Sequence, residues 1–309
     1  MTDRAPFAAP RIGTTRRAFV AGAVACLANA ALPRWAMPAV AVGTATELPA
    51  PPFEIGVQSF TLRRYAFEPM LDVLVSLGVR RVELIPELAV FFYRFGSHLP
   101  VTDDAAAIAK AREALAARGI SISASGVHSI PDEAEARRLF DFAGRAGIPL
   151  LTISPDDDAL DAIDRLCRER PGIRVGIHNH GPYTRYDTIA DVEASLAGRA
   201  PNFGACVDTG HFIRSGEDPV EALRRLGERV HGIHLKDHVE SGFFASGCLL
   251  GEGRLDLVAC FRALREIGFG SDLAGPERAI SLELERDGET LLADVAACLR
   301  TAALAAGKA

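Results

Sequence analysis

Three short apolar segments between residues 175 and 237 end abruptly in histidine, aspartate or lysine. They constrain the fold more than any other part of the chain. The segments read VGIHNH at 175–180, ACVDTGH at 205–211 and HGIHLKD at 231–237. Each begins as a β-prone run, and helix-like sequence separates one from the next. Strands joined by helices run parallel, and their C-terminal ends meet at one rim of the sheet. We therefore expect the polar ends of the three segments to lie close together.

The same alternation extends over most of the chain. Strands are predicted at 54–60, 79–84, 120–125, 149–154, 173–177, 203–207, 230–235 and 279–284. Helices are predicted at 67–77, 102–117, 131–145, 156–168, 187–196, 219–226, 255–267 and 288–305. Eight strands that alternate with helices favour an α/β fold of one domain, the (β/α)8 TIM barrel, over an open doubly wound sheet. The barrel is assigned to residues 53–309.

The N-terminal part of the chain has the character of an export signal followed by a linker. Two adjacent arginines, Arg16 and Arg17, precede an apolar run rich in alanine and glycine. This pattern resembles a bacterial twin-arginine signal, so residues 1–41 are predicted to be the signal and 42–52 a flexible linker. Pro33 closes the apolar run early, which argues against a stable membrane span. The expected location is the periplasm or another extracytoplasmic space.

The composition is that of an acidic globular protein. Hydrophobic residues make up 49% of the chain and charged residues 24%, which is enough for a sizeable core. The formal net charge of −6 leaves no basic patch to neutralise phosphates, so nucleic acid is not an expected partner. The six cysteines include no CxxC pair, and most lie within apolar runs. Buried reduced thiols are therefore expected rather than disulfides.

Polar residues end most of the predicted strands, the three described above included. These residues are Glu83, His128, His178, His180, Asp208, His211, His234, Lys236, Asp237, Glu283 and Glu285. In a barrel the C-terminal ends of all strands converge on one face, so residues distant in sequence become neighbours there. Neutral imidazoles and ionised carboxylates are ligands that suit zinc, manganese, iron or cobalt. The working hypothesis is a metal site at the C-terminal mouth of the barrel.

The order of these motifs resembles that of a known superfamily. The sequence contains, in order, VEL, HNH, VDTGH, HLKD, GEGxxD and LELE. This pattern is similar to that of the xylose isomerase-like barrel superfamily, which includes sugar phosphate isomerases and epimerases and shares its barrel with endonuclease IV. The resemblance covers about residues 55–304. Each motif is weak by itself, but their order and spacing together are fairly specific.

The resemblance implies one divalent metal ion, with Mn, Zn, Co, Fe and Mg all open. Family members hold it through a carboxylate on strand five, Asp on strand six, His on strand seven and Glu on strand eight. The matching residues for the last three are Asp208, His234 and Glu283. Strand five departs from the pattern, because IHNH stands where many epimerases have Glu. Either of its two histidines could be the strand-five ligand. His178 is preferred over His180 because it aligns with the family glutamate.

The departure at strand five also affects the acid–base residues. In the ketose epimerases the glutamates of strands five and eight bind the metal and act as paired acid and base. Here only Glu283 can play that double role. The candidates for its partner are Glu83, His128, His180 and His211. The resemblance therefore implies catalytic roles for Glu283, Glu83 and His211. It implies substrate contacts for His128, His180 and Lys236.

Some polar residues also admit a purely structural role. His180 can cap the turn that follows it instead of touching a ligand. Lys236 can pair with Asp237 instead of holding a substrate oxygen. His231 and His238 are predicted to be surface or turn histidines.

The loop over 238–254 is long and rich in glycine. Its GEG segment at 251–253 is similar to part of a nucleotide-binding loop. No strand precedes it in the βαβ arrangement that such a loop requires, so it is predicted to be a lid turn.

Together these residues predict a metal-dependent isomerase or epimerase with a small carbohydrate as substrate. A divalent metal bound to the oxygens of a sugar or keto-sugar acidifies the carbon-bound proton between them. Glu283 can remove that proton to give a metal-stabilised enediolate, and reprotonation completes the reaction. The same enediolate can expel a β-substituent, so a lyase or 3-keto-glycoside-cleaving enzyme is the alternative. A non-catalytic exported carbohydrate-binding barrel is a third possibility, and the oligomeric state stays open.

Overall fold

The computed structural model describes residues 53–86, 88–90, 93–95, 98–270 and 278–309. The predicted export signal and linker lie outside these residues, so both stay predictions. Among the described residues, no helix combines the length and the apolar character that crossing a membrane requires.

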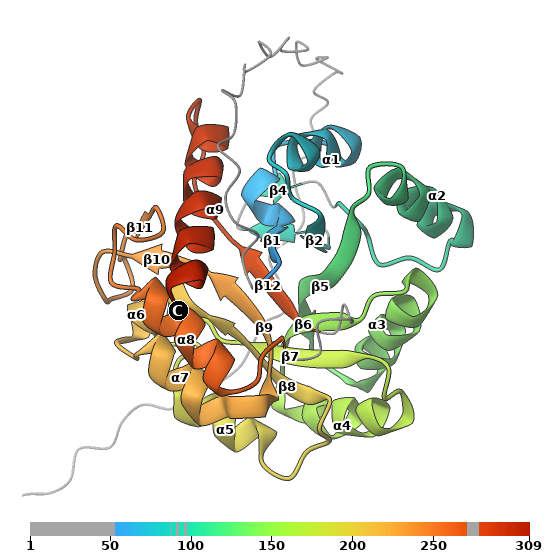
Figure 1. Cartoon of the computed structure of the whole chain (residues 1–309). Helices are drawn as coiled ribbons and strands as arrows, with labels where there is room; N and C mark the ends of the chain where they lie inside the picture. The colour runs from blue at the N-terminus through green and yellow to red at the C-terminus, as the bar shows by residue number, and fades with distance from the viewer. Residues whose placement is uncertain (1–52, 87, 91–92, 96–97, 271–277) are drawn as a thin grey trace, which may run out of the picture. The chain divides into compact units, whose positions relative to one another are not determined.

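Eight parallel strands form a closed barrel. They are β1 (Ile55–Gln58), β2 (Arg81–Leu84), β5 (Ser121–Ile130), β6 (Leu150–Pro155), β7 (Arg174–His178), β8 (Phe203–Asp208), β9 (Val230–Leu235) and β12 (Ala279–Leu282). They follow one another around the barrel in chain order, and β12 closes it by pairing with both β9 and β1 (Figure 1). The predicted (β/α)8 TIM barrel is thereby confirmed.

Helices surround the strands (Figure 1). The α-helices are α1 (Phe67–Ser76), α2 (Ala105–Ala116), α3 (Glu133–Ala146), α4 (Leu160–Glu169), α5 (Ile189–Leu196), α6 (Thr209–Ser215), α7 (Pro219–Leu226), α8 (Leu257–Glu266) and α9 (Leu291–Lys308). Short 3-10 helices are η1 (Ser59–Leu62), η2 (Asp157–Ala159) and η3 (Gly227–Arg229).

Helix α3 illustrates how the local sequence sets these elements. The Asp132 carboxylate accepts a hydrogen bond from the Glu135 backbone N–H at 2.9 Å, which caps the first turn. Gly147 ends the helix with a φ of +69°, a conformation that glycine adopts without steric cost. Leu139 and Phe140 are fully buried on one face. Burial of such a side chain contributes about 1.5–3 kcal/mol.

The main apolar core lies between the strands and the surrounding helices. Ile177, Val207 and Ile233, from β7, β8 and β9, are fully buried members of it. Successive residues of a strand point to opposite faces, so the next residue along each strand points to the inside of the barrel. Those next residues are His178, Asp208 and His234, which are polar and lie directly beside the apolar core.

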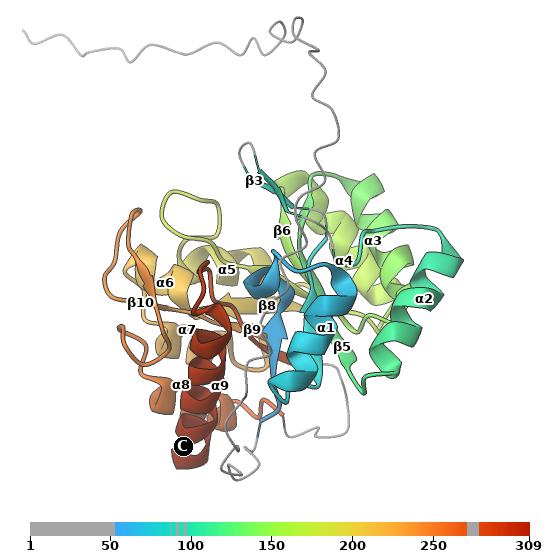
Figure 2. The ribbon, with the colours of Figure 1, turned by 90° about the horizontal axis from the view of Figure 1, so that it is seen from above.

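The structure adds elements that the sequence analysis does not predict. Helix α6 occupies residues 209–215, and β5 continues to Ile130, so His128 lies within a strand. Two antiparallel hairpins are also present, β3 (Leu88–Val90) with β4 (Tyr93–Phe95), and β10 (Asp237–His238) with β11 (Gly247–Cys248). They follow the C-terminal ends of β2 and β9, and Figure 2 shows β3 near the top of the view and β10 at its left.

Candidate metal centre

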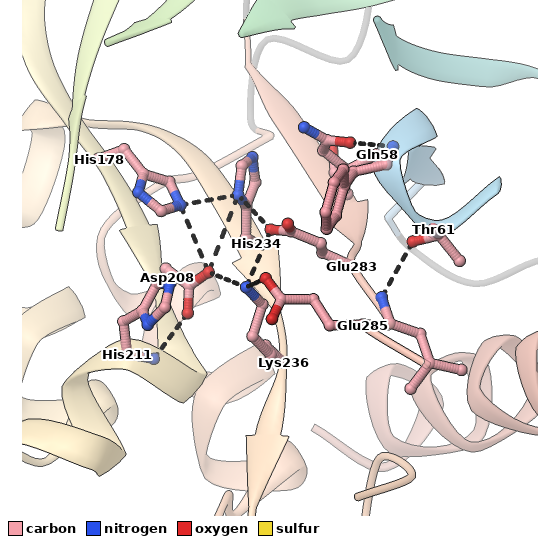
Figure 3. A network of polar contacts seen from close by, with 12 residues as sticks. Gln58, Thr61, His178, Asp208, His211, His234, Lys236, Glu283 and Glu285 are labelled. Carbon is pink, nitrogen blue, oxygen red and sulfur yellow. Dashed lines mark hydrogen bonds and ion pairs between the residues drawn. The ribbon is translucent and has the colours of Figure 1, made fainter. Parts of the chain in front are cut away.

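Four buried side chains converge at the C-terminal end of the barrel (Figure 3). They are His178, Asp208, His234 and Glu283. The strands that position them, β7, β8, β9 and β12, are neighbours in the barrel. Asp208 and His234 are direct partners in the register of β8 and β9. Glu283 directly follows β12, and its backbone N–H donates to the carbonyl of Leu235 at 3.2 Å.

The donor atoms of these four residues all lie within 4.8 Å of one another. His178 Nε2 is 3.0 Å from His234 Nδ1 and 3.4 Å from Asp208 Oδ2. Glu283 Oε2 is 3.0 Å from His234 Nδ1. Two imidazoles and two carboxylates on rigid strands suit zinc or another divalent transition metal. The sequence predicts the same four residues as ligands, and metal binding by them stays a prediction.

The state of the buried oxygen atoms fits a cation at this point. Within the described part of the chain, Asp208 Oδ2 and Glu283 Oε2 are shielded from solvent and have no hydrogen-bond partner. A buried carboxylate oxygen in that state is costly unless positive charge lies close by. A metal ion between the four side chains would supply that charge.

Lys236 already brings positive charge to the same place. Its Nζ is 3.2 Å from Asp208 Oδ2, 3.3 Å from Glu283 Oε2 and 2.9 Å from Glu285 Oε1. Burial lowers the pKa of Lys236, but the three carboxylates outweigh burial and raise it well above its ordinary value. Burial likewise raises the pKa of Asp208 and of Glu283, and the Lys236 ammonium reverses both shifts. All three groups therefore stay ionised.

Glu83 lies behind His234. Its Oε2 accepts hydrogen bonds from His234 Nε2 at 2.8 Å and from Ser281 at 2.9 Å, and its Oε1 accepts one from Thr152 at 2.6 Å. Burial raises the pKa of Glu83, but His234 and the two hydroxyls outweigh burial and lower it. The carboxylate therefore keeps a proton on Nε2 of His234, which leaves Nδ1 for the metal site. This geometry fits the positioning of a ligand better than contact with a substrate.

The end of β7 distinguishes the two histidines of the IHNH segment. His178 belongs to the converging group, whereas His180 lies beside that group. The ring centroids of the two histidines are 4.6 Å apart. Between them, Asn179 donates to the carbonyl of Asp208 at 3.0 Å and accepts from its N–H at 2.7 Å. Asn179 thus ties β7 to β8 at the height of the ligands. Asn179 is not among the residues predicted from the sequence, although an amide between two candidate ligands was a usable signal.

His211 lies next to this group, in the first turn of α6. Its ring centroid is 5.6 Å from that of His178 and 5.5 Å from that of His180. Arg214 Nη1 donates to His211 Nδ1 at 3.2 Å. Since arginine carries only donors, Nδ1 is the acceptor and the proton of the neutral ring is on Nε2. Burial lowers the pKa of His211 well below its ordinary value and that of His180 to about 3. Both rings are therefore neutral.

Of the remaining histidines, His128, His231 and His238 are also buried. His128 is bonded to a serine hydroxyl of its own strand, and burial lowers its pKa to about 4. The prediction that His231 and His238 are surface or turn residues is wrong, because they are 0% and 7% exposed. His231 lies at a shift in the register of β8 and β9 and meets the carbonyl of Val175 at 3.0 Å. It covers Gly204, where an added Cβ would lie 2.6 Å from the imidazole.

Asp237 organises the loop that follows β9. Its carboxylate accepts backbone hydrogen bonds from Gly251, Gly253 and Leu255, each at 3.0 Å. Among the described residues, Lys236 does not pair with Asp237 but with the carboxylates named above. A Cβ at Gly253 would lie 2.3 Å from Asp237 Oδ1, so this close approach requires glycine. The GEG segment is a turn, as predicted. Its hydrogen bonds to Asp237 hold it next to Lys236, the preceding residue.

Comparison with known proteins agrees with the barrel fold. A family model described as "Xylose isomerase-like TIM barrel" matches residues 71–302. The chain is 32% identical over 103 residues to 3-oxo-isoapionate decarboxylase of Pectobacterium atrosepticum, which covers 31% of this chain and 36% of that protein. It is 28% identical over 169 residues to inosose dehydratase of Bacillus cereus (strain AH820), which covers 52% of this chain and 53% of that protein. The chain thus matches between about a third and about half of the length of these relatives.

A solved structure shares the barrel. The IOLI protein with a binding zinc atom superimposes with a TM-score of 0.61 over 83% of this chain and 99% of that chain. The two sequences are 16% identical, so this likeness concerns the fold alone.

Proposed function

This chain belongs to the xylose isomerase-like TIM barrel family, and on that premise we propose that it is a divalent-metal-dependent enzyme acting on a sugar or keto-sugar. Its first step is the removal of a carbon-bound proton next to a carbonyl group. The observation that carries the proposal is the convergence of His178, Asp208, His234 and Glu283. The relatives named inosose dehydratase and 3-oxo-isoapionate decarboxylase support a small polyhydroxylated compound as the substrate.

The metal and Glu283 have complementary tasks in this proposal. A divalent ion held by the four side chains supplies Lewis acidity, which makes the proton next to a bound carbonyl easier to remove. Glu283 is the candidate base, since it is ionised and its Oε2 lies within the group of four, 3.0 Å from His234 Nδ1 and 3.3 Å from Lys236 Nζ. The lowered pKa makes this carboxylate a weak base, so the proton that it removes must be strongly acidified.

The remaining side chains bind and orient the substrate. His211 carries its proton on Nε2 and can donate it to a substrate hydroxyl, and His180 adds a second neutral ring beside it. The Lys236 ammonium lies 3.3 Å from Glu283, beside the candidate base. It can therefore hold a substrate oxygen or deliver a proton to it. Glu83 positions His234 and does not need to touch the substrate.

A specific observation favours elimination as a second candidate outcome beside isomerisation or epimerisation. Epimerisation needs an acid–base group on each face of one carbon, and at strand five His178 replaces the carboxylate that would serve one face. Elimination needs one base and one acid. Glu283 would take the proton from carbon, and Lys236 would give a proton to the oxygen that leaves the neighbouring carbon. Removal of the proton from one carbon and loss of the protonated hydroxyl from the next would then yield water and an unsaturated ketone.

Deuterium exchange tests the common first step. Purified protein with Mn²⁺ or Zn²⁺ is incubated in D₂O with a panel of keto-sugars and cyclic keto-polyols and followed by NMR and mass spectrometry. Deuterium is expected at the carbon next to the carbonyl. A rearranged sugar indicates isomerisation, and loss of water indicates elimination.

Two variants make this test specific. Glu283→Gln should slow exchange by at least about 100-fold. Glu240→Gln is the matched control, because Glu240 is an exposed carboxylate on the loop after β9 and lies outside the group of four. It should retain exchange within a few-fold. Absence of exchange from every compound, with metal bound, would leave a carbohydrate-binding barrel as the explanation.

A further inference from the structure

Three exposed aromatic side chains form a cluster on two loops beside the metal centre. Tyr183 follows β7, and Phe243 and Phe244 lie between β10 and β11. They are 89%, 52% and 91% exposed, respectively. The ring centroids of Tyr183 and Phe243 are 6.2 Å apart, and those of Phe243 and Phe244 are 5.0 Å apart. We call these three residues the aromatic platform. Clustered apolar rings in solvent are characteristic of a binding surface.

The backbone holds the platform in place. Tyr183 has a φ of +69°, in the left-handed region that tyrosine rarely adopts, and its N–H donates to Asp187 Oδ2 at 2.8 Å. On the second loop, Gly242 N–H donates to the carbonyl of Arg214 at 2.7 Å, and Arg214 Nη2 donates to the carbonyl of Phe243 at 2.6 Å. A conformation that costs energy and is fixed by hydrogen bonds indicates a function for the ring that it presents.

Arg214 connects the platform to the metal centre. The guanidinium that binds the carbonyl of Phe243 also donates to His211 Nδ1 at 3.2 Å. Gly181 packs against it so closely that an added Cβ would lie 2.9 Å from the guanidinium. His211 in turn contacts the ring of His178, one of the four converging residues. The loops after β7 and around β10 lie next to each other at the left of Figure 2.

This order of contacts sets the size of the ligand. A single sugar ring at the metal centre would meet His180 and His211. It would not meet the platform, because the contacts from His178 to Phe243 run through two further side chains, His211 and Arg214. A second ring attached to that sugar would extend outward over the loops that carry Tyr183 and Phe243. Apolar faces of sugars and aryl rings both gain free energy by stacking on aromatic side chains.

We propose that the aromatic platform is a second subsite, which binds the outer ring of a two-ring glycoside whose inner ring reaches the metal centre. The assignment of the inner ring rests on the proposed function. The contribution of the outer ring rests on the platform itself. An experiment can therefore refute the place of the inner ring without refuting the binding of the outer ring, and the reverse.

Ligand-detected NMR titrations of the metal-loaded protein test the proposal with matched probes. Phenyl β-glucoside is compared with methyl β-glucoside, and cellobiose with glucose, so that each pair differs by one ring. The two-ring member should bind more tightly in at least one pair. The pair that responds shows whether the outer ring is aryl or sugar. Tyr183→Ala and Phe244→Ala should each weaken that member by about three- to tenfold and leave its one-ring partner unchanged.

The control is Leu304→Ala, which removes a 49% exposed apolar side chain from α9 rather than from these loops. It should leave every affinity unchanged. Glu283→Gln should slow deuterium exchange by at least about 100-fold yet keep the preference for the second ring. Equal affinities within both pairs, or no effect of the platform variants, would overturn the proposal. So would a dimer in sedimentation experiments that Phe244→Ala dissociates, because a second copy would then cover the rings.

Discussion

The ion pair of Glu83 and His234 shows how much of the centre depends on a residue outside it. His234 can present Nδ1 to a metal only if Nε2 keeps its proton, and the Glu83 carboxylate at 2.8 Å ensures that. Glu83→Gln preserves the shape and the hydroxyl contacts but removes the charge that polarises the imidazole. Loss of such a partner typically reduces metal affinity by about 10- to 100-fold. We expect a reduction in this range, measured by competition with a chelating dye.

The thermal unfolding of Glu83→Gln serves as its control. The glutamine amide can still accept from His234 or from the hydroxyls of Thr152 and Ser281, but it removes one charge of a buried ion pair. The metal-free variant should therefore unfold at a lower temperature than the metal-free parent, still in one cooperative transition. Unchanged metal affinity would show that Glu83 has no positioning role. A substrate role would instead predict normal metal affinity with lost turnover, so the two measurements separate the roles.

At the scale of elements, the loop after β9 depends on one carboxylate. Asp237→Ala leaves the N–H groups of Gly251, Gly253 and Leu255 without their acceptor. Part of that loss is recovered by water once the loop loosens, so we expect a decrease of about 1–3 kcal/mol in the free energy of unfolding. Hydrogen exchange followed by mass spectrometry should show faster exchange over 247–256. Glu240→Ala removes an exposed acid from the same loop and should show neither change.

The barrel strands were predictable because each is a local apolar run bounded by turn residues. Helix α6 was not, since its seven residues are too few to show a helical period, and its first turn depends on Asp208 accepting from the His211 N–H at 2.7 Å. His231 was misplaced for a different reason. The shift in register between β8 and β9 arises from the pairing of the two strands, and neither strand reveals it alone.

The candidate site likewise has a part that the sequence predicts and a part that only the structure shows. Asp208, His234 and Glu283 stand in short motifs at strand ends, so the closed barrel brings them together, as expected. The contact between Glu83 and His234 joins residues 151 positions apart, and only the three-dimensional structure reveals it. The contacts of Arg214 depend on where the loop around Phe243 lies, which the sequence does not specify.

At the scale of the whole molecule, metal binding should add to a barrel that is already stable. The apolar core between strands and helices does not involve the four converging residues, and Lys236 offsets part of the charge of Asp208 and Glu283. Removal of the metal should therefore lower the unfolding temperature without unfolding the protein. A ligand at 100 times its dissociation constant stabilises by about 2.7 kcal/mol, which corresponds to a shift of about 5–10 °C in a domain of this size.

Calorimetry with Mn²⁺ or Zn²⁺, and again after addition of a chelator, measures this shift. Asp208→Ala should unfold at the same temperature under both conditions, because the group of four is then incomplete. Leu304→Ala should keep the full shift. If the parent protein unfolded at one temperature with and without chelator, the ion would not be bound by the folded barrel. The converging side chains would then have to be explained as a buried network neutralised by Lys236 alone.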